Sequence, residues 1–179
     1  MEILRTPEER FDNLHDYNFV PNYINILDQN LGELRMHYLD EGRQFSKVAL
    51  LLHGEPTWSY LYRTMIPILV KNGIRVIAPD FIGFGKSDKP SDRGSYSYNG
   101  HVDWINIFFR KLNLKNVTLF GQDWGGLIGL RLLCDNQESF DAVMIGNTAL
   151  PTGDHDLGKP LEAWREFSQT NILFKSGSI

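Results

Sequence analysis

The sequence predicts an α/β fold in which a mostly parallel sheet is flanked by helices. Short, continuous apolar runs such as 48–52 alternate along the chain with longer stretches such as 98–112, in which apolar residues recur at helical spacing. Continuous apolar runs are typical of strands that are buried on both faces. Strands separated by helices form βαβ units, so the sheet is expected to be mostly parallel.

Each element has its own pattern. Strands are expected at 34–39, 48–52, 74–78, 117–120 and 142–145, and helices at 59–72, 98–112 and 124–136. The alternation in 34–39 indicates a half-exposed strand. In the first helix Ser59 is the expected N-cap, Gly73 the stop, and Pro67 is expected to kink or break it. The glycines and prolines of 81–94 predict an ordered loop.

Composition narrows the class of protein. The 179 residues are 42% apolar and 22% charged, as in an ordinary globular domain, and carry a net charge of −4 without clusters of basic residues. Cys134 is the only cysteine, which excludes an internal disulfide and a zinc–thiolate site. No secretory signal and no apolar run near the roughly 20 residues of a membrane span is present. We expect a soluble, cytoplasmic protein with no metal, cofactor, nucleic-acid or membrane partner.

The most informative motif is centred on Asp123, between a predicted strand and a predicted helix. Gly121 and Gly125 flank it at two residues on either side, a spacing that allows the sharp strand–turn–helix known as a nucleophile elbow. A serine at such a position needs a base, whereas an aspartate, with a reference pKa of about 3.9, is ionised at neutral pH. Asp123 is therefore the candidate nucleophile, suited to displacement at carbon.

Two kinds of hydrogen-bond donor accompany this nucleophile. His53-Gly54-Glu55-Pro56 follows a buried strand, so the backbone N–H groups of Glu55 and Trp124 are the candidate oxyanion donors. The alternative is that Glu55 is only a turn residue. The indole N–H of Trp124 suits a weakly hydrated anion such as a halide, and Trp164 is the candidate second donor, with packing as its alternative. Trp58 and Trp104 are assigned to packing.

Three segments together resemble the haloalkane dehalogenases: HGEPTWSYLYR at 53–63, APDFIGFGKSDKP at 78–90 and QDWGG at 122–126. The opening RTPEERFDNL at 5–14 is similar to the subfamily whose catalytic acid follows a later strand. The resemblance covers practically the whole chain. It implies an α/β-hydrolase fold, Asp123 as nucleophile, Trp124 and Trp164 as halide ligands, and a small halogenated alkane and water as substrates.

The chain departs from the family pattern in its histidines. The family uses a late histidine as base and a carboxylate that orients it, but the only histidine after Asp123 is His155, which is expected in a surface loop. Asn147 stands where some relatives carry the acid. We expect His53 to support its loop, and three histidines to lie on the surface or on helix faces (His15, His37, His101). Full turnover is therefore not expected.

The expected organisation has two parts. Residues 1–149 are predicted to form the N-terminal part of an α/β-hydrolase core, and 150–179 the start of an incomplete helical cap with an amphipathic helix at 161–169. The fold is expected to stop before the last strands and most of the cap. The strand that ends near Ile145 would then be an exposed apolar edge through which the chain could self-associate.

Two alternatives remain open at this point. An epoxide hydrolase fragment would share the aspartate elbow and the His-Gly-x-Pro loop, but it would use cap tyrosines to protonate the epoxide oxygen. A non-catalytic truncated product would have no activity of its own. Glu55, Gln122 and the pair Trp124 and Trp164 favour the dehalogenase over the epoxide hydrolase.

Overall fold

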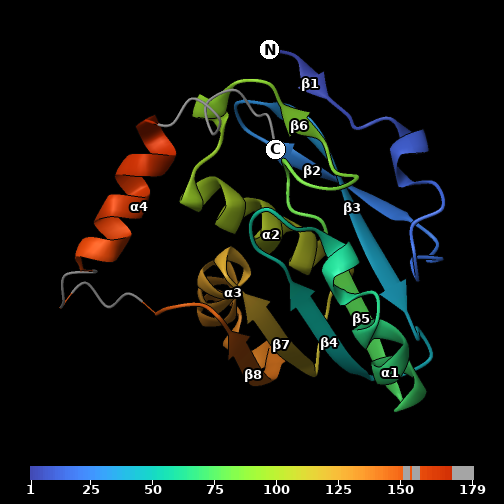
Figure 1. Ribbon diagram of the computed structural model, residues 1–179. Helices are drawn as coiled ribbons and strands as arrows, with labels where there is room; N and C mark the ends of the chain where they lie inside the picture. Colours follow the sequence, from blue (N-terminus) through green and yellow to red (C-terminus); the bar gives the residue numbers. More distant parts are fainter. Residues whose placement is uncertain (151–153, 155–157, 171–179) are drawn as a thin grey trace. The chain divides into compact units, whose positions relative to one another are not determined.

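The computed structural model describes residues 1–150, 154 and 158–170, and the chain divides into two units, Met1–Ala149 and Leu150–Ile179. The first unit is built on a six-stranded sheet with the strand order β2-β3-β5-β4-β7-β8 (Figure 1). Its strands are β2 (Asn22–Asp28), β3 (Gly32–Glu41), β4 (Lys47–Leu52), β5 (Ile74–Pro79), β7 (Val117–Gln122) and β8 (Phe140–Gly146). A two-stranded sheet pairs β1 (Ile3–Leu4) with β6 (Lys89–Pro90).

The helices of the first unit are α1 (Met65–Lys71), α2 (Tyr98–Leu112) and α3 (Trp124–Asp135), and α4 (Lys159–Thr170) lies in the second unit. Four 3-10 helices complete the described elements: η1 (Glu8–Phe11), η2 (Ser59–Tyr62), η3 (Arg93–Ser95) and η4 (Gln137–Ser139). None of the described helices is long and apolar enough to cross a bilayer.

The pairing confirms a mostly parallel sheet. β4 lies parallel to β5 and β7, β7 lies parallel to β8, and β3 is antiparallel to both β2 and β5. The sequence analysis missed β2, whose inward Ile24 and Ile26 alternate with more exposed neighbours. That alternation was the available signal for a strand at the edge of the sheet.

Both faces of the central strands are covered, which explains their continuous apolar sequences. In β4, Leu50 and Leu52 pack in the cluster beneath α2 and α3, whereas Ala49 and Leu51 pack in the cluster beneath α1. Successive side chains of a strand point to opposite faces, so a strand between two helical layers has no polar face. The first unit is thus a three-layer structure (Figure 1).

The segment predicted as one helix at 59–72 forms two pieces, η2 and α1. The break lies at 63–64, ahead of Pro67, and Pro67 itself sits in the first turn of α1, where a backbone N–H has no helical partner to lose. Ser59 does not cap the helix through its side chain. Its hydroxyl bonds Tyr17 Oη at 2.7 Å, and its N–H donates to Asp80 Oδ1 at 2.8 Å.

The expectation of a half-exposed strand at 34–39 is wrong for most of β3. Leu34, Met36 and Leu39 are fully buried, and His37 between them is fully buried as well. The 81–94 loop covers this strand: Asp88 N–H donates to Arg35 O at 2.9 Å, and His37 N–H donates to Ser87 Oγ at 2.9 Å. The loop is ordered, as predicted.

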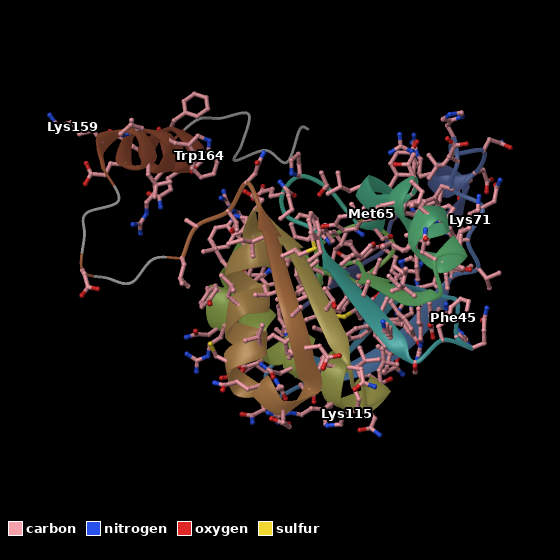
Figure 2. All side chains as sticks on the ribbon, turned by 90° about the horizontal axis from the view of Figure 1, so that it is seen from below. Phe45, Met65, Lys71, Lys115, Lys159 and Trp164 are labelled. Atoms are coloured by element: carbon pink, nitrogen blue, oxygen red, sulfur yellow. The ribbon has the colours of Figure 1, made fainter. Side chains whose placement is uncertain are left out.

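β8 is the edge strand opposite β2 in the described part of the chain. The edge of β8 that faces away from β7 forms no strand pairing there. Val143, Met144 and Ile145 on this strand are exposed although they are apolar. In the second unit, α4 contains the helix expected at 161–169, and its Trp164 is 52% exposed (Figure 2).

Candidate active site

Asp123 occupies the sharp turn between β7 and α3. Its φ of 53° and ψ of −125° lie in a region that residues with a side chain rarely adopt. A Cβ on Gly125 would collide with the carbonyl oxygens of Leu52 and His53, and one on Gly121 would lie 2.7 Å from Gly125 O. The strand, turn and helix therefore approach one another at distances that only glycine allows.

The Asp123 side chain is directed at the loop that follows β4. The Glu55 N–H donates to Asp123 Oδ1 at 2.9 Å, while Oδ2 has no hydrogen-bond partner among the described residues. Gly54 must lack a side chain because a Cβ there would collide with the carboxylate. The Asp123 carbonyl accepts the Thr148 hydroxyl at 2.8 Å, which ties the elbow to the chain beyond β8. One carboxylate oxygen is thus held and the other is available.

His53 supports its loop, as the sequence predicts. Its Nδ1 donates to Gly54 O at 2.9 Å and its Nε2 accepts the Phe81 N–H at 3.0 Å, so both ring nitrogens are used. Burial lowers the pKa of His53, although the charges of Asp80 and Asp123 and the bond to Gly54 oppose the shift. His53 is therefore neutral and structural, and it is not available to activate water.

The structure corrects the expectation for His37, which is not a surface residue. His37 Nδ1 lies 2.8 Å from Asp80 Oδ2, and both side chains are fully buried. Asp80 also accepts the N–H groups of Ser59 and Lys86, at 2.8 and 2.9 Å. Burial favours a higher pKa for Asp80, but the hydrogen bond and the charge of His37 and the Lys86 N–H outweigh it and lower the pKa.

A pocket of about 210 Å³ opens beside the elbow. Its walls are mainly aromatic and come from the loops after β4 and β5 and from the starts of α2 and α3; they are Gly54, Glu55, Phe81, Phe84, Tyr96, Ser97, Tyr98, His101, Trp124 and Ile128. Trp124 is 40% exposed, and its indole N–H has no partner among the described residues. The pocket therefore presents an apolar surface next to Asp123, with an unused donor at its wall.

His101 is a pocket residue that the sequence analysis placed on a surface or helix face. It lies in α2, and the centroid of its ring is 6.1 Å from that of Tyr96 and 5.0 Å from that of Trp104. Its Nδ1 is buried without a hydrogen-bond partner. Burial, with a contribution from the nearby His53, lowers the pKa of His101 to about 4, so the ring is neutral at pH 7.

The remaining sequence candidates lie elsewhere or outside the description. Trp164 belongs to the second unit, on α4. His155 lies outside the described residues. His15 is a surface residue, as expected, and Asn147 follows β8 with a φ of 45°. Within the described ranges, no group of three His, Cys, Asp or Glu side chains could hold a metal ion.

A comparison with protein-family models identifies the fold family of the chain. Residues 48–172 match the family model of the alpha/beta hydrolase fold, which covers more than half of the chain, and the chain belongs to that family. The elbow at Asp123 and the donor loop at Glu55 occupy the places that a nucleophile and its oxyanion loop take in this fold.

The particular relatives are haloalkane dehalogenases. The chain is 59% identical over 99% of its length to the haloalkane dehalogenase of Psychrobacter cryohalolentis, and 50% identical over its whole length to that of Mycolicibacterium paratuberculosis. It spans 58% and 60% of the length of these relatives. The tetrameric haloalkane dehalogenase DpaA from Paraglaciecola agarilytica NO2 matches 96% of this chain with a TM-score of 0.88 at 42% identity, and the match covers 57% of DpaA. These matches confirm the resemblance found in the sequence.

Proposed function

We propose that Asp123 displaces halide from a small haloalkane and forms an alkyl ester, the first step of a haloalkane dehalogenase. The observation that carries this proposal is the carboxylate itself: it projects from a strained elbow beside an apolar pocket, with Oδ1 held by the Glu55 N–H. The unpartnered Oδ2 attacks the carbon that bears the halogen, the new C–O bond forms as the carbon–halogen bond breaks, and the halide leaves with the bonding pair.

The hydrogen-bond donors around Asp123 have two different roles in this proposal. The N–H groups of Glu55 and Trp124 serve as the backbone donors for charge on the carboxylate oxygens. The Trp124 indole binds the departing halide, and Trp164 is the second halide donor, from a second unit that forms the start of a helical cap. The identity with dehalogenases across 99% of the chain supports these assignments.

Hydrolysis of the ester needs a base that the described residues do not place at Asp123. Both ring nitrogens of His53 are engaged, and His37 is buried against Asp80. His101 opens to the pocket, but its lowered pKa makes it a weak base. We therefore expect a single alkylation per chain instead of continued turnover. A cytoplasmic location stays a prediction of the sequence.

Mass spectrometry of the intact chain after incubation with 1-bromobutane tests this proposal. We expect one butyl group per chain, located on Asp123 by peptide mapping, and none in the isosteric variant Asp123→Asn. Absence of any ester would overturn the proposal and leave the non-catalytic alternative. Release of bromide that continues beyond one equivalent per chain would show that a base is present after all.

The same assay separates the epoxide hydrolase alternative. That activity needs phenol protons aimed at the epoxide oxygen, but both tyrosines of the described pocket donate to backbone carbonyls, Tyr96 to Pro90 O at 2.9 Å and Tyr98 to Leu127 O at 3.1 Å. Burial also raises the pKa of Tyr96 to about 12. We expect 1,2-epoxybutane to leave Asp123 unmodified where 1-bromobutane alkylates it.

A further inference from the structure

The three hydroxyl groups of the pocket wall are all committed to the protein. The Tyr96 and Tyr98 hydroxyls bond backbone carbonyls, and Ser97 Oγ accepts the Gly100 N–H at 3.0 Å at the start of α2. Among the described side chains of the pocket wall, only the exposed Glu55 carboxylate, the Trp124 indole and the His101 imidazole have no hydrogen-bond partner. The His101 imidazole is thus an uncharged polar group of the pocket that the proposed displacement step does not use.

His101 and His53 pack against the same two aromatic rings. The centroids of Phe81 and Phe84 lie 4.8 and 5.3 Å from that of His53, and 5.9 and 6.5 Å from that of His101. His53 precedes Gly54 and Glu55, which face Asp123. His101 is therefore a second polar point in the same pocket, and it is positioned by α2 and not by the loop that faces Asp123.

The chemistry of this point favours an uncharged ligand group. A neutral imidazole carries one donor and one acceptor, and a hydroxyl can satisfy either of them. The pocket wall contains no cationic side chain, so a carboxylate on the ligand would be unpaired and would also meet the charge of Asp123. A methyl group of the ligand beside His101 would leave the imidazole nitrogens without a hydrogen-bond partner.

We propose that His101 recognises a hydroxyl on the substrate carbon chain, away from the halogen, so that halogenated primary alcohols are the preferred substrates. This inference rests on the proposed displacement by Asp123. His101 is a specificity residue in it, because it contacts the substrate but not the reacting atoms. A site that hydrogen-bonds a substrate hydroxyl discriminates against the analogue that lacks it, since the polar group of the site is then left unpaired.

The experiment compares 3-bromo-1-propanol with 1-bromobutane, which have the same leaving group and differ by a hydroxyl in place of a methyl. The rate constants for Asp123 alkylation are measured by mass spectrometry with the full chain and with His101→Phe, which keeps an aromatic ring between Tyr96 and Trp104. We expect a preference for the bromoalcohol of about 10-fold in the parent chain, lost in His101→Phe and partly restored in His101→Gln. Asp103→Asn, on the exposed side of α2 and outside the pocket wall, is the control and keeps the preference.

An unchanged rate ratio in His101→Phe would overturn the inference while leaving the displacement by Asp123 intact. If neither bromide alkylates the chain, the proposed function fails, and the recognition is then decided by binding. Titration of Asp123→Asn with 3-bromo-1-propanol is expected to shift the ¹⁵N resonances of the His101 imidazole, assigned through His101→Phe. A shift of the same size with 1-bromobutane, or none with either compound, would refute the hydroxyl contact.

Discussion

At the scale of single residues, the elbow depends on the absence of side chains around Asp123. The closest approach is at Gly125, where any Cβ would meet the backbone carbonyl oxygens at the end of β4. Backbone atoms cannot rotate away as a side chain can, so the added methyl must displace β4 or α3. The strain at Asp123 is maintained because the end of β4 packs directly against the start of α3.

We predict that Gly125→Ala lowers the free energy of unfolding by about 3 kcal/mol and abolishes Asp123 alkylation, because the overpacked turn moves the carboxylate. Gly146→Ala is the control, since a Cβ there would lie 3.7 Å from Phe120 in ordinary contact. Urea unfolding of both variants measures the difference. Equal stabilities would show that the elbow tolerates a side chain.

The buried pair His37 and Asp80 is a second feature that depends on single residues. Asp80 joins β3, η2 and the loop after β5 through His37, Ser59 and Lys86. This carboxylate therefore holds the 81–94 loop, which supplies Phe81 and Phe84 to the pocket. These contacts compensate its buried charge, so the loss of the charge is expected to loosen all three segments.

We predict that Asp80→Asn destabilises the chain by about 3 kcal/mol, because an amide cannot accept all three N–H groups and leaves a buried polar group unpaired. Asp103→Asn, on the exposed side of α2, is expected to change stability by less than about 0.5 kcal/mol. Chemical denaturation of both variants checks this prediction, and a neutral Asp80→Asn would contradict it.

At the scale of elements, β8 and β2 are the two edge strands of the six-stranded sheet within the described residues (Figure 1). β8 differs from β2 because three consecutive apolar residues on it, Val143, Met144 and Ile145, are exposed. An apolar strand with an unpaired edge is a template for association.

We predict that the chain self-associates through β8, and that Met144→Lys weakens this association because a charge on an edge strand opposes pairing. Met144 is 61% exposed, and Ile68→Lys on α1, at a residue 63% exposed, is the matched control. Sedimentation velocity over a range of concentrations measures the effect. A monomer at all concentrations, or equal effects of the two substitutions, would argue against the edge.

At the scale of the whole molecule, two buried histidines make stability depend on pH. The pKa values of His53 and His101 are both lowered by burial, that of His101 to about 4. Between about pH 6.5 and pH 4 the unfolded chain therefore binds more protons at these sites than the folded chain does. Stability rises with pH in that window and is lost as the pH falls.

We predict that the free energy of unfolding falls by a few kcal/mol between about pH 7 and pH 4, and that the fall is smaller in His101→Phe, which has one titrating group fewer. Urea unfolding at several pH values across this range gives the slope of the unfolding free energy against pH for the parent chain and for His101→Phe. If the slopes coincide, His101 does not contribute to the acid sensitivity.

Sequence reasoning recovered the parts of this protein whose cause is local. The helical spacing of apolar residues placed α2 at 98–112, and the glycine spacing around Asp123 placed the elbow between β7 and α3. It failed where distant segments decide the environment. His37 is buried by the 81–94 loop, and Ser59, predicted as a helix N-cap, bonds Asp80 and Tyr17 instead.

The sequence by itself therefore determined the α/β class, the candidate nucleophile Asp123 and the donor loop at Glu55, because periodicity, glycine spacing and the order of residues after a strand are properties of the local chain. Only the tertiary structure decided that the Glu55 N–H reaches Asp123 Oδ1, that His37 pairs with Asp80, and that His101 faces the pocket. Burial and unpaired hydrogen-bonding atoms arise when segments far apart in the chain pack together, and no local pattern records them.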